Sequence, residues 1–250
     1  MKKYIYTFCI ILSSLLTSQD FKLSPNTQKS IDGKNIIKKY LKTIGGEKKI
    51  EKINTIIKEF TIEIDGLSNI YMKGEILYKE PNLYSSVLEI EEIGEIQSTK
   101  YDGQQCVIKR KNNNETIQKK IEGKMLKEKE QEFLPFPILQ YKKNNAEFSM
   151  LEIQESNKRK IYKVSVKGDQ KKEIILFFDA KDNLLIRKKI IDETKKETID
   201  YQNYQKIEGI MFPFLEINTT TINNKIAQKS TKTISNIIIN QQLSVDHFQE

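Results

Sequence analysis

The chain offers few side chains for acid–base or nucleophilic chemistry. Its 250 residues include a single histidine, His247, close to the C-terminus. Serine and cysteine hydrolases, and zinc peptidases with paired histidines, need histidine held among other catalytic groups. A lone histidine beside a chain end does not supply this, so we expect His247 to lie on the surface. The sequence also lacks a cysteine pair at metal-ligand spacing and a glycine-rich phosphate loop.

Carboxylate pairs are the remaining candidates for catalysis. Glu91 is followed by Glu92, and Asp200 is close in sequence to Glu208. A glycosidase places two carboxyl groups about 5 to 9.5 Å apart in a cleft. Because the chain has 34 acidic residues and no tryptophan to stack on a sugar, chance explains these pairs better. We therefore predict that the protein is not an enzyme and needs no metal or cofactor.

The basic charge of the chain does not indicate nucleic-acid binding. The formal net charge is +8, and almost all of the 42 basic residues are lysines. The bidentate guanidinium contacts typical of base and phosphate recognition are therefore scarce. The lysines are also spread along the chain among acidic neighbours, as at Lys48, Lys49, Lys195 and Lys196. This pattern is typical of a solvated surface.

The first residues have the pattern of a signal peptide. Lys2 and Lys3 precede an apolar run that is shorter than the about 20 residues of a membrane-spanning helix. We expect residues 1–19 to be a cleaved signal peptide, residues 20–32 a linker and residues 33–250 the folded domain. An uncleaved membrane anchor is the alternative. Export by this route predicts a periplasmic protein.

Cysteine usage fits an exported protein without a disulfide. Cys9 lies inside the apolar run, too early for lipid attachment. Removal of the signal peptide leaves Cys106 as the only cysteine, so stability must come from the core. We expect Cys106 to be a small buried hydrophobic residue.

Apolar periodicity predicts a short helix followed by many strands. The helical spacing begins after Asp32, a capping residue, and ends at Gly45 and Gly46. From residue 56 onward, apolar and polar residues alternate in short stretches that are separated by turn signals such as Asp102-Gly103. The predicted fold class is mainly β with a few helices (α+β), an antiparallel meander of about ten strands curled into a barrel or half-barrel.

Five passages occur in an order that resembles a known family. The fourth of them has the pattern Tyr-x-x-Tyr-x-x-hydrophobic-x-Gly-Ile-x-Phe-Pro, and together they occupy residues 41–53, 101–103, 178–187, 201–213 and 237–248. The chain resembles the LolA/LolB-like periplasmic lipoprotein-carrier superfamily, in particular outer-membrane lipoprotein-sorting proteins. It is similar also to the C-terminal domain of some bacterial insulinase-type zinc-peptidase chains, although the peptidase half is absent.

The resemblance implies an open half-barrel, lidded by short helices, around an apolar cavity for acyl chains. The strands nearest the start of the domain supply most of the candidate lining of that cavity, which is Phe60, Ile62, Ile64, Met72, Ile76, Leu88 and Phe177. The alternative for each of these residues is an ordinary place in the core.

Two functions follow from this reasoning. The first is a periplasmic carrier that binds lipoprotein acyl chains or another lipid for outer-membrane lipoprotein sorting. This carrier is expected to be a monomer that contacts membranes only transiently. The second is a non-catalytic interaction module that docks on an envelope protein or a peptidase partner. An open apolar cavity favours the carrier, whereas a filled core with an exposed apolar patch favours the module.

Overall fold

The structure is a computed structural model that describes residues 32–67, 70–112, 115–156, 159–168 and 172–250. The predicted signal peptide and residues 20–31 of the predicted linker lie outside these residues, so the division of the chain into leader, linker and domain stays a prediction. Within the described ranges, no helix is both long and apolar enough to cross a membrane.

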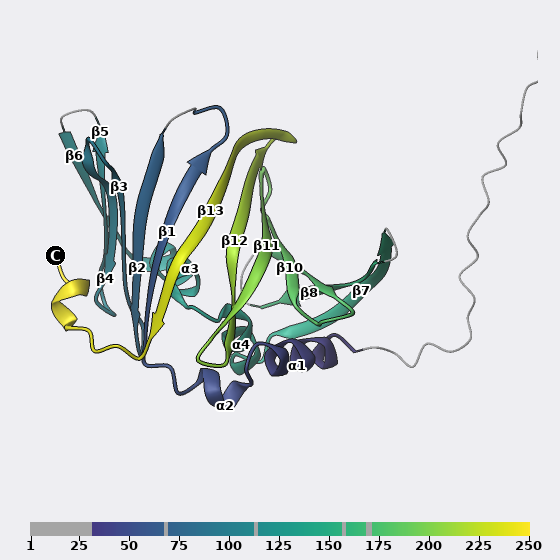
Figure 1. Ribbon diagram of the computed structural model, residues 1–250. Helices are drawn as coiled ribbons and strands as arrows, with labels where there is room; N and C mark the ends of the chain where they lie inside the picture. Colours follow the sequence, from purple (N-terminus) through teal and green to yellow (C-terminus); the bar gives the residue numbers. More distant parts are fainter. Residues whose placement is uncertain (1–31, 68–69, 113–114, 157–158, 169–171) are drawn as a thin grey trace, which may run out of the picture. The chain divides into compact units, whose positions relative to one another are not determined.

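One antiparallel sheet of thirteen strands dominates the described part of the chain (Figure 1). Six strands come from its first half: β1 (Thr55–Ile64), β2 (Tyr71–Lys79), β3 (Leu83–Ile90), β4 (Gly94–Tyr101), β5 (Cys106–Asn112) and β6 (Glu115–Ile121). Seven come from its second half: β7 (Glu147–Ser156), β8 (Arg159–Lys167), β9 (Glu173–Asp179), β10 (Leu185–Ile191), β11 (Lys195–Ile207), β12 (Ile210–Ile222) and β13 (Lys225–Ile239). The predicted class, a curled antiparallel sheet with short helices, is confirmed, with thirteen strands in place of about ten.

The order of the strands explains why helices cross the sheet. Each half is a meander, and the two halves join in the middle where β13 pairs with β1. β6 is therefore at one edge and β7 at the other, so residues 122–146 must connect opposite edges. This connection contains α3 (Gly123–Phe133) and α4 (Pro137–Lys143). Ile138, Leu139 and Tyr141 of α4 pack into the main core.

α1 (Gly33–Thr43) packs into the same core as α4. The side chain of Asp32 caps it by accepting a hydrogen bond from the main-chain N–H of Lys34 at 3.1 Å. After the helix, Gly45 has a φ of 133°, and a β-carbon there would lie 2.6 Å from Ile210 Cδ1. Glycine therefore allows the chain to pass closely over β12 into α2 (Glu47–Ile50). The helix buries Ile36, Ile37 and Leu41.

Different segments of the chain pack on the two faces of the sheet. The face that carries Ile56, Phe60 and Leu176 packs against α1 and α4 in the main core, and we call it the inner face. On the other face, a smaller cluster lies under the C-terminal segment that ends in the 3₁₀ turn η1 (Val245–Phe248). His247 is exposed in this turn, as predicted.

A β-bulge in β13 changes which side chains face inward. The register against β1 shifts between Glu59 and Phe60 so that Ser235 is an extra residue in β13. Ile237 and Ile234 therefore both belong to the main core although they are three positions apart. Beyond the bulge, alternation continues from Ile234, and Lys232 also faces inward.

A second bulge has the same effect in β10. Leu185 pairs with Phe178, but Arg187 pairs with Phe177, so Ile186 is the extra residue. Leu185 lies in the main core. Because of the extra residue, the next inward side chain is Lys188, which pairs with the buried Leu176.

Candidate ligand-binding cavity

A cavity of about 370 Å³ lies between the inner face of the sheet and the helical layer. Pockets for small molecules usually have about 300 to 1,000 Å³. The helical side of its wall includes Tyr40 and Leu41 from α1 and Leu139 and Tyr141 from α4. Both halves of the sheet contribute apolar side chains to the other side, among them Ile56, Ile76, Leu176, Leu185, Ile190, Ile199 and Phe212. The cavity is thus formed by segments that are far apart in the sequence.

Residues 133–137, from the last residue of α3 to the first residue of α4, form the part of the wall that we call the lid segment. The ring of Phe133 stacks on Tyr84, with centroids 4.4 Å apart. The ring of Phe136 is tilted against Phe212, with centroids 5.7 Å apart. Each aromatic pair contributes about 0.5 to 1.5 kcal/mol beyond the apolar area that it buries, so these rings help to hold the lid segment on the sheet.

Charged side chains occupy one part of this otherwise apolar cavity. Lys232 Nζ lies 3.6 Å from Glu216 Oε2, and the two side chains are 21% and 20% exposed. Lys232 Nζ also lies 4.7 Å from the centroid of the Phe60 ring, a cation–π distance. Lys58 from β1 and Lys188 from β10 line the same cavity. Three lysines and three glutamates, Glu132, Glu197 and Glu216, therefore line the cavity.

Lys58 has no such ion pair. Among the described residues, no carboxylate oxygen lies within 4.0 Å of its ammonium group, and its nearest charged neighbourhood is the Glu216 and Lys232 pair. Burial lowers the pKa of Lys58, the negative charge of Glu216 opposes this, and the positive charge of Lys232 adds to it. Lys58 Nζ lies 5.6 Å from the centroid of the Phe212 ring. The ammonium group is thus compensated only by this cation–π contact and by the more distant Glu216.

Lys188 is in a similar position on the other side of the cavity. It also forms no ion pair within the described ranges. Burial lowers its pKa, and the more distant carboxylates of Glu132, Glu197 and Glu216 act in the opposite direction.

Six tyrosines line the cavity, among them Tyr141, Tyr201 and Tyr204. Burial raises the pKa of Tyr141 to about 12 and raises the pKa of Tyr201 and Tyr204 above the ordinary value. All three are therefore neutral near pH 7 and can donate a hydrogen bond. Tyr204 donates to the main-chain carbonyl of Leu185 at 2.7 Å.

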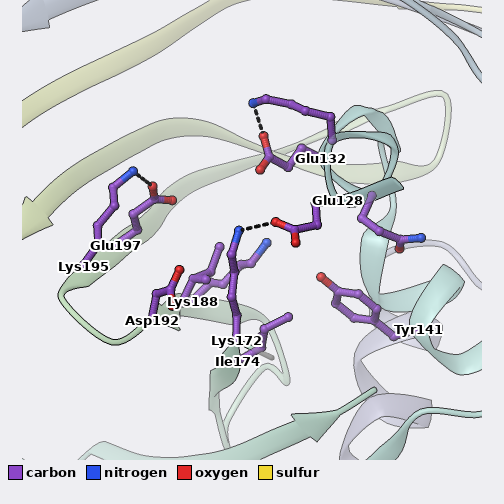
Figure 2. A pocket seen from close by; sticks show the side chains of 12 residues that line it. Glu128, Glu132, Tyr141, Lys172, Ile174, Lys188, Asp192, Lys195 and Glu197 are labelled. Carbon is purple, nitrogen blue, oxygen red and sulfur yellow. Dashed lines mark hydrogen bonds and ion pairs between the residues drawn. The ribbon is translucent and has the colours of Figure 1, made fainter. Parts of the chain in front are cut away.

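A polar hollow of about 230 Å³ adjoins the cavity (Figure 2). The two spaces are neighbours, since they share the lining residues Glu132, Tyr141, Lys188, Ile190 and Glu197. Three ion pairs neutralise most of its charge: Lys172–Glu128 at 3.2 Å, Lys195–Glu197 and Lys129–Glu132. The first two are marked between labelled residues in Figure 2. Lys188 lies at the junction of the polar hollow and the apolar cavity.

The structure gathers only part of the predicted cavity lining. Ile76 lines the cavity. A β-carbon at Gly74 would lie 2.4 Å from Phe60 Cζ, so the Phe60 ring covers Gly74 and lies outside the described lining. The strand registers place four further predicted residues on the inner face beside Phe60 and toward the β1–β2 turn, outside that lining: Ile62, Ile64, Met72 and Leu88. Their role in ligand binding stays a prediction.

Phe177 lies on the opposite face of the sheet. Its neighbours Leu176 and Phe178 belong to the main core, whereas Phe177 lines a separate hollow with Arg187 and Asp200. Alternation could not separate these residues because β9 is buried on both faces, from Ile174 to Asp179. The same limit explains why the seven predicted residues do not meet at one site.

The charged residues of the cavity were not predicted, although the sequence contains a signal for two of them. Lys58 interrupts an inward series that otherwise reads Ile56, Phe60 and Ile62. Glu216 likewise extends the inward series of Phe212 and Phe214 in β12. A charge at a position whose neighbours two residues away are buried indicates a functional or paired group.

The candidate catalytic groups are engaged elsewhere. The carboxylate of Asp200 accepts a hydrogen bond from Arg187 Nη2 at 3.1 Å. Cys106 is fully buried, and burial raises the pKa of its thiol, which disfavours the reactive thiolate. Within the part of the chain that the structure describes, no group of three or more His, Cys, Asp or Glu side chains could hold a metal ion.

Comparison with known proteins gives similarities in structure only. The sequence matches no protein-family model and no curated protein. Its structure is similar to a LolA superfamily protein from Nitrosomonas europaea, with a TM-score of 0.57, 12% identity, and coverage of 88% of this chain and 99% of that chain. A DUF1329 family protein from Desulfovibrio piger is similar with a TM-score of 0.57 and 11% identity, over 87% of this chain and 97% of that chain. A domain from Vibrio parahaemolyticus that is assigned to outer membrane lipoprotein-sorting proteins is similar with a TM-score of 0.56 and 10% identity, over 87% of this chain and 97% of that chain.

The chain therefore has the LolA-like fold, a curled antiparallel sheet whose inner face is partly covered by helices. This confirms the fold that the sequence resemblance implied. The similarity to domains of zinc-peptidase chains stays a prediction.

Proposed function

We propose that the protein is a non-catalytic carrier that binds the acyl chain of a lipid or lipoprotein in the cavity under the lid segment. The observation that supports this most directly is the cavity of about 370 Å³ in the middle of the inner face. The LolA-like fold agrees with it, since one neighbour is assigned to lipoprotein sorting. Because one fold can host many functions, the cavity carries the argument.

The energetics of such a site are favourable. An acyl chain gains about 0.8 kcal/mol for each methylene that it buries. The wall offers aliphatic and aromatic contacts along both halves of the sheet, from Ile76 on β2 to Ile190 on β10. A chain several methylenes long would therefore bind with useful affinity, while the lid segment lets it enter and leave.

The proposed setting is the periplasm. The basic residues and apolar run at the start of the sequence support export. In this setting the carrier is a monomer that collects its ligand from one membrane and delivers it to an acceptor, with only transient membrane contact.

Binding can be tested with purified protein and the neutral fluorophore N-phenyl-1-naphthylamine, which brightens in apolar surroundings. We expect the fluorophore to bind and 1-dodecanol to displace it. Ile76→Trp, which fills the cavity, lowers the affinity about tenfold or more. Ile64→Trp is the matched control, since Ile64 lies on the same strand face but outside the described cavity wall.

Native mass spectra and lipid extraction of the purified protein complete this test. Co-purified acyl species that are lost in Ile76→Trp support the carrier. A lipid-free protein that binds neither fluorophore nor dodecanol contradicts it and leaves the interaction module as the better explanation. If Ile64→Trp also blocks binding, the site extends toward the β1–β2 turn, as the sequence predicted.

A further inference from the structure

The arrangement of charge in the cavity is unusual for a site that holds only hydrocarbon. Lys232 is paired with Glu216, and three of the four acids of the polar hollow are paired with Lys129, Lys172 and Lys195. The fourth acid, Asp192, lines the hollow but not the cavity. Once these pairs are set aside, Lys58 and Lys188 remain as two ammonium groups that line the cavity without an ion pair to a described residue.

Unpaired ammonium groups in such a place weaken the fold. A partly desolvated charge without a partner costs free energy, and an apolar residue of similar volume would avoid that cost. Lysine can often extend its ammonium group into water, but Lys58 and Lys188 point into a space that is walled by the sheet and the helical layer. An anionic ligand group would supply the missing partner.

We propose that the ligand is an acidic amphiphile, an alkyl or acyl chain with a carboxylate or phosphate group that Lys58 and Lys188 recognise. This inference rests on the proposed carrier function and adds the chemical class of the ligand. A lipid without a free acid group would leave both lysines uncompensated.

The geometry gives each part of such a ligand a place. Lys188 lies where the polar hollow meets the cavity (Figure 2), so an acidic group near it remains accessible to water. The cavity then continues past Glu216 to Ile76 and Tyr84 at its far side. Lys58 pairs with Ile76 across β1 and β2, so it approaches the cavity from the other side of Glu216. Tyr201, whose hydroxyl forms no hydrogen bond within the described ranges, lines this region and can donate one.

The test compares ligands that share a chain length and differ in charge. Displacement of N-phenyl-1-naphthylamine is measured with dodecanoate, dodecyl phosphate, 1-dodecanol and inorganic phosphate. We expect the two acidic amphiphiles to bind about tenfold or more tightly than dodecanol, because hydrogen bonds to charged groups are strong. The relative affinity of dodecanoate and dodecyl phosphate shows which acidic group the site prefers.

Substitution of the lysines locates the effect. Lys58→Met and Lys188→Met should each remove most of the preference for acid over alcohol while dodecanol binds as before. Lys189→Met is the matched control, because Lys189 follows Lys188 in the chain but lies over the Phe177 ring on the opposite face, 5.2 Å from its centroid. It removes the same charge and should keep the preference. The wild-type comparison of acid with alcohol decides the question even if a variant does not fold.

Each result separates the two proposals. Equal affinity for dodecanoate and dodecanol overturns the acidic ligand and leaves the carrier intact. Binding of inorganic phosphate as tight as that of dodecyl phosphate overturns the amphiphile, because the site would then recognise a free anion. Failure of every alkyl ligand to bind contradicts the carrier, and the acidic-ligand inference falls with it.

Discussion

Tyr204→Phe tests whether one hydrogen bond holds the bulge that turns Lys188 into the cavity. The Tyr204 hydroxyl donates to the carbonyl of Leu185 at 2.7 Å, and Ile186, the extra residue of the bulge, follows directly. A bulge interrupts the ladder of main-chain hydrogen bonds, so a side-chain donor at this carbonyl replaces what the neighbouring strand does not provide.

The expected loss can be worked out from this contact. Phenylalanine preserves the ring but leaves a largely buried carbonyl without its donor, which costs about 1 to 2 kcal/mol. For a folded unit of this size, 1 kcal/mol corresponds to about 2 to 4 °C in Tm. We therefore expect Tyr204→Phe to melt about 2 to 8 °C below the wild type.

The assay is urea unfolding followed by circular dichroism, together with thermal melts. Tyr201→Phe is the matched control, since Tyr201 is also buried at the cavity but its hydroxyl has no hydrogen-bond partner among the described residues. It should change the free energy of unfolding by less than about 0.5 kcal/mol. Equal stabilities of the two variants would refute the reasoning, because the hydrogen bond to Leu185 would then contribute nothing measurable.

Two further predictions concern the cavity. Lys58→Met should raise the free energy of unfolding at pH 7, because burial lowers the pKa of Lys58 in the folded protein. The cost of burying the charged ammonium group destabilises the wild type fully below the folded pKa and disappears as the pH rises past the unfolded pKa near 10.5. The gain in stability measured in melts should therefore shrink toward pH 10.5. A gain that is absent at pH 7, or that grows with pH, would contradict this. Phe136→Ala removes the ring that packs 5.7 Å from Phe212, so it should speed ligand dissociation several-fold in stopped-flow displacement while lowering the free energy of unfolding by about 2 kcal/mol. An unchanged dissociation rate would show that the lid segment does not control release.

The sequence alone was sufficient for the class of fold. Period-two alternation in β1 and β2 and the turn signals between strands predicted an antiparallel sheet. The capping residue Asp32 and the glycines after the first helix predicted its ends. The order of strands was not predictable from these local signals, because the pairing of β1 with β13 joins residues almost 200 positions apart, such as Ile56 and Ile239.

The structure brings together only part of the predicted cavity lining, for a related reason. Alternation identified Ile76, which lines the cavity, but it equally selected Ile62 and Met72, which lie on the same face beyond it. Which part of an apolar face is left uncovered depends on where the helices rest. That in turn follows from the crossing of residues 122–146 between opposite edges of the sheet.

The charged groups of the cavity show most clearly what each level of structure decided. Lys58 faces inward by simple alternation with Ile56, so the sequence already determined its direction once β1 was recognised. Lys188 and Lys232 face inward because of the bulges at Ile186 and Ser235. An extra residue in one strand reverses the facing of every position beyond it. Since a bulge is defined by pairing with another strand, only the tertiary structure could bring the three lysines to one cavity.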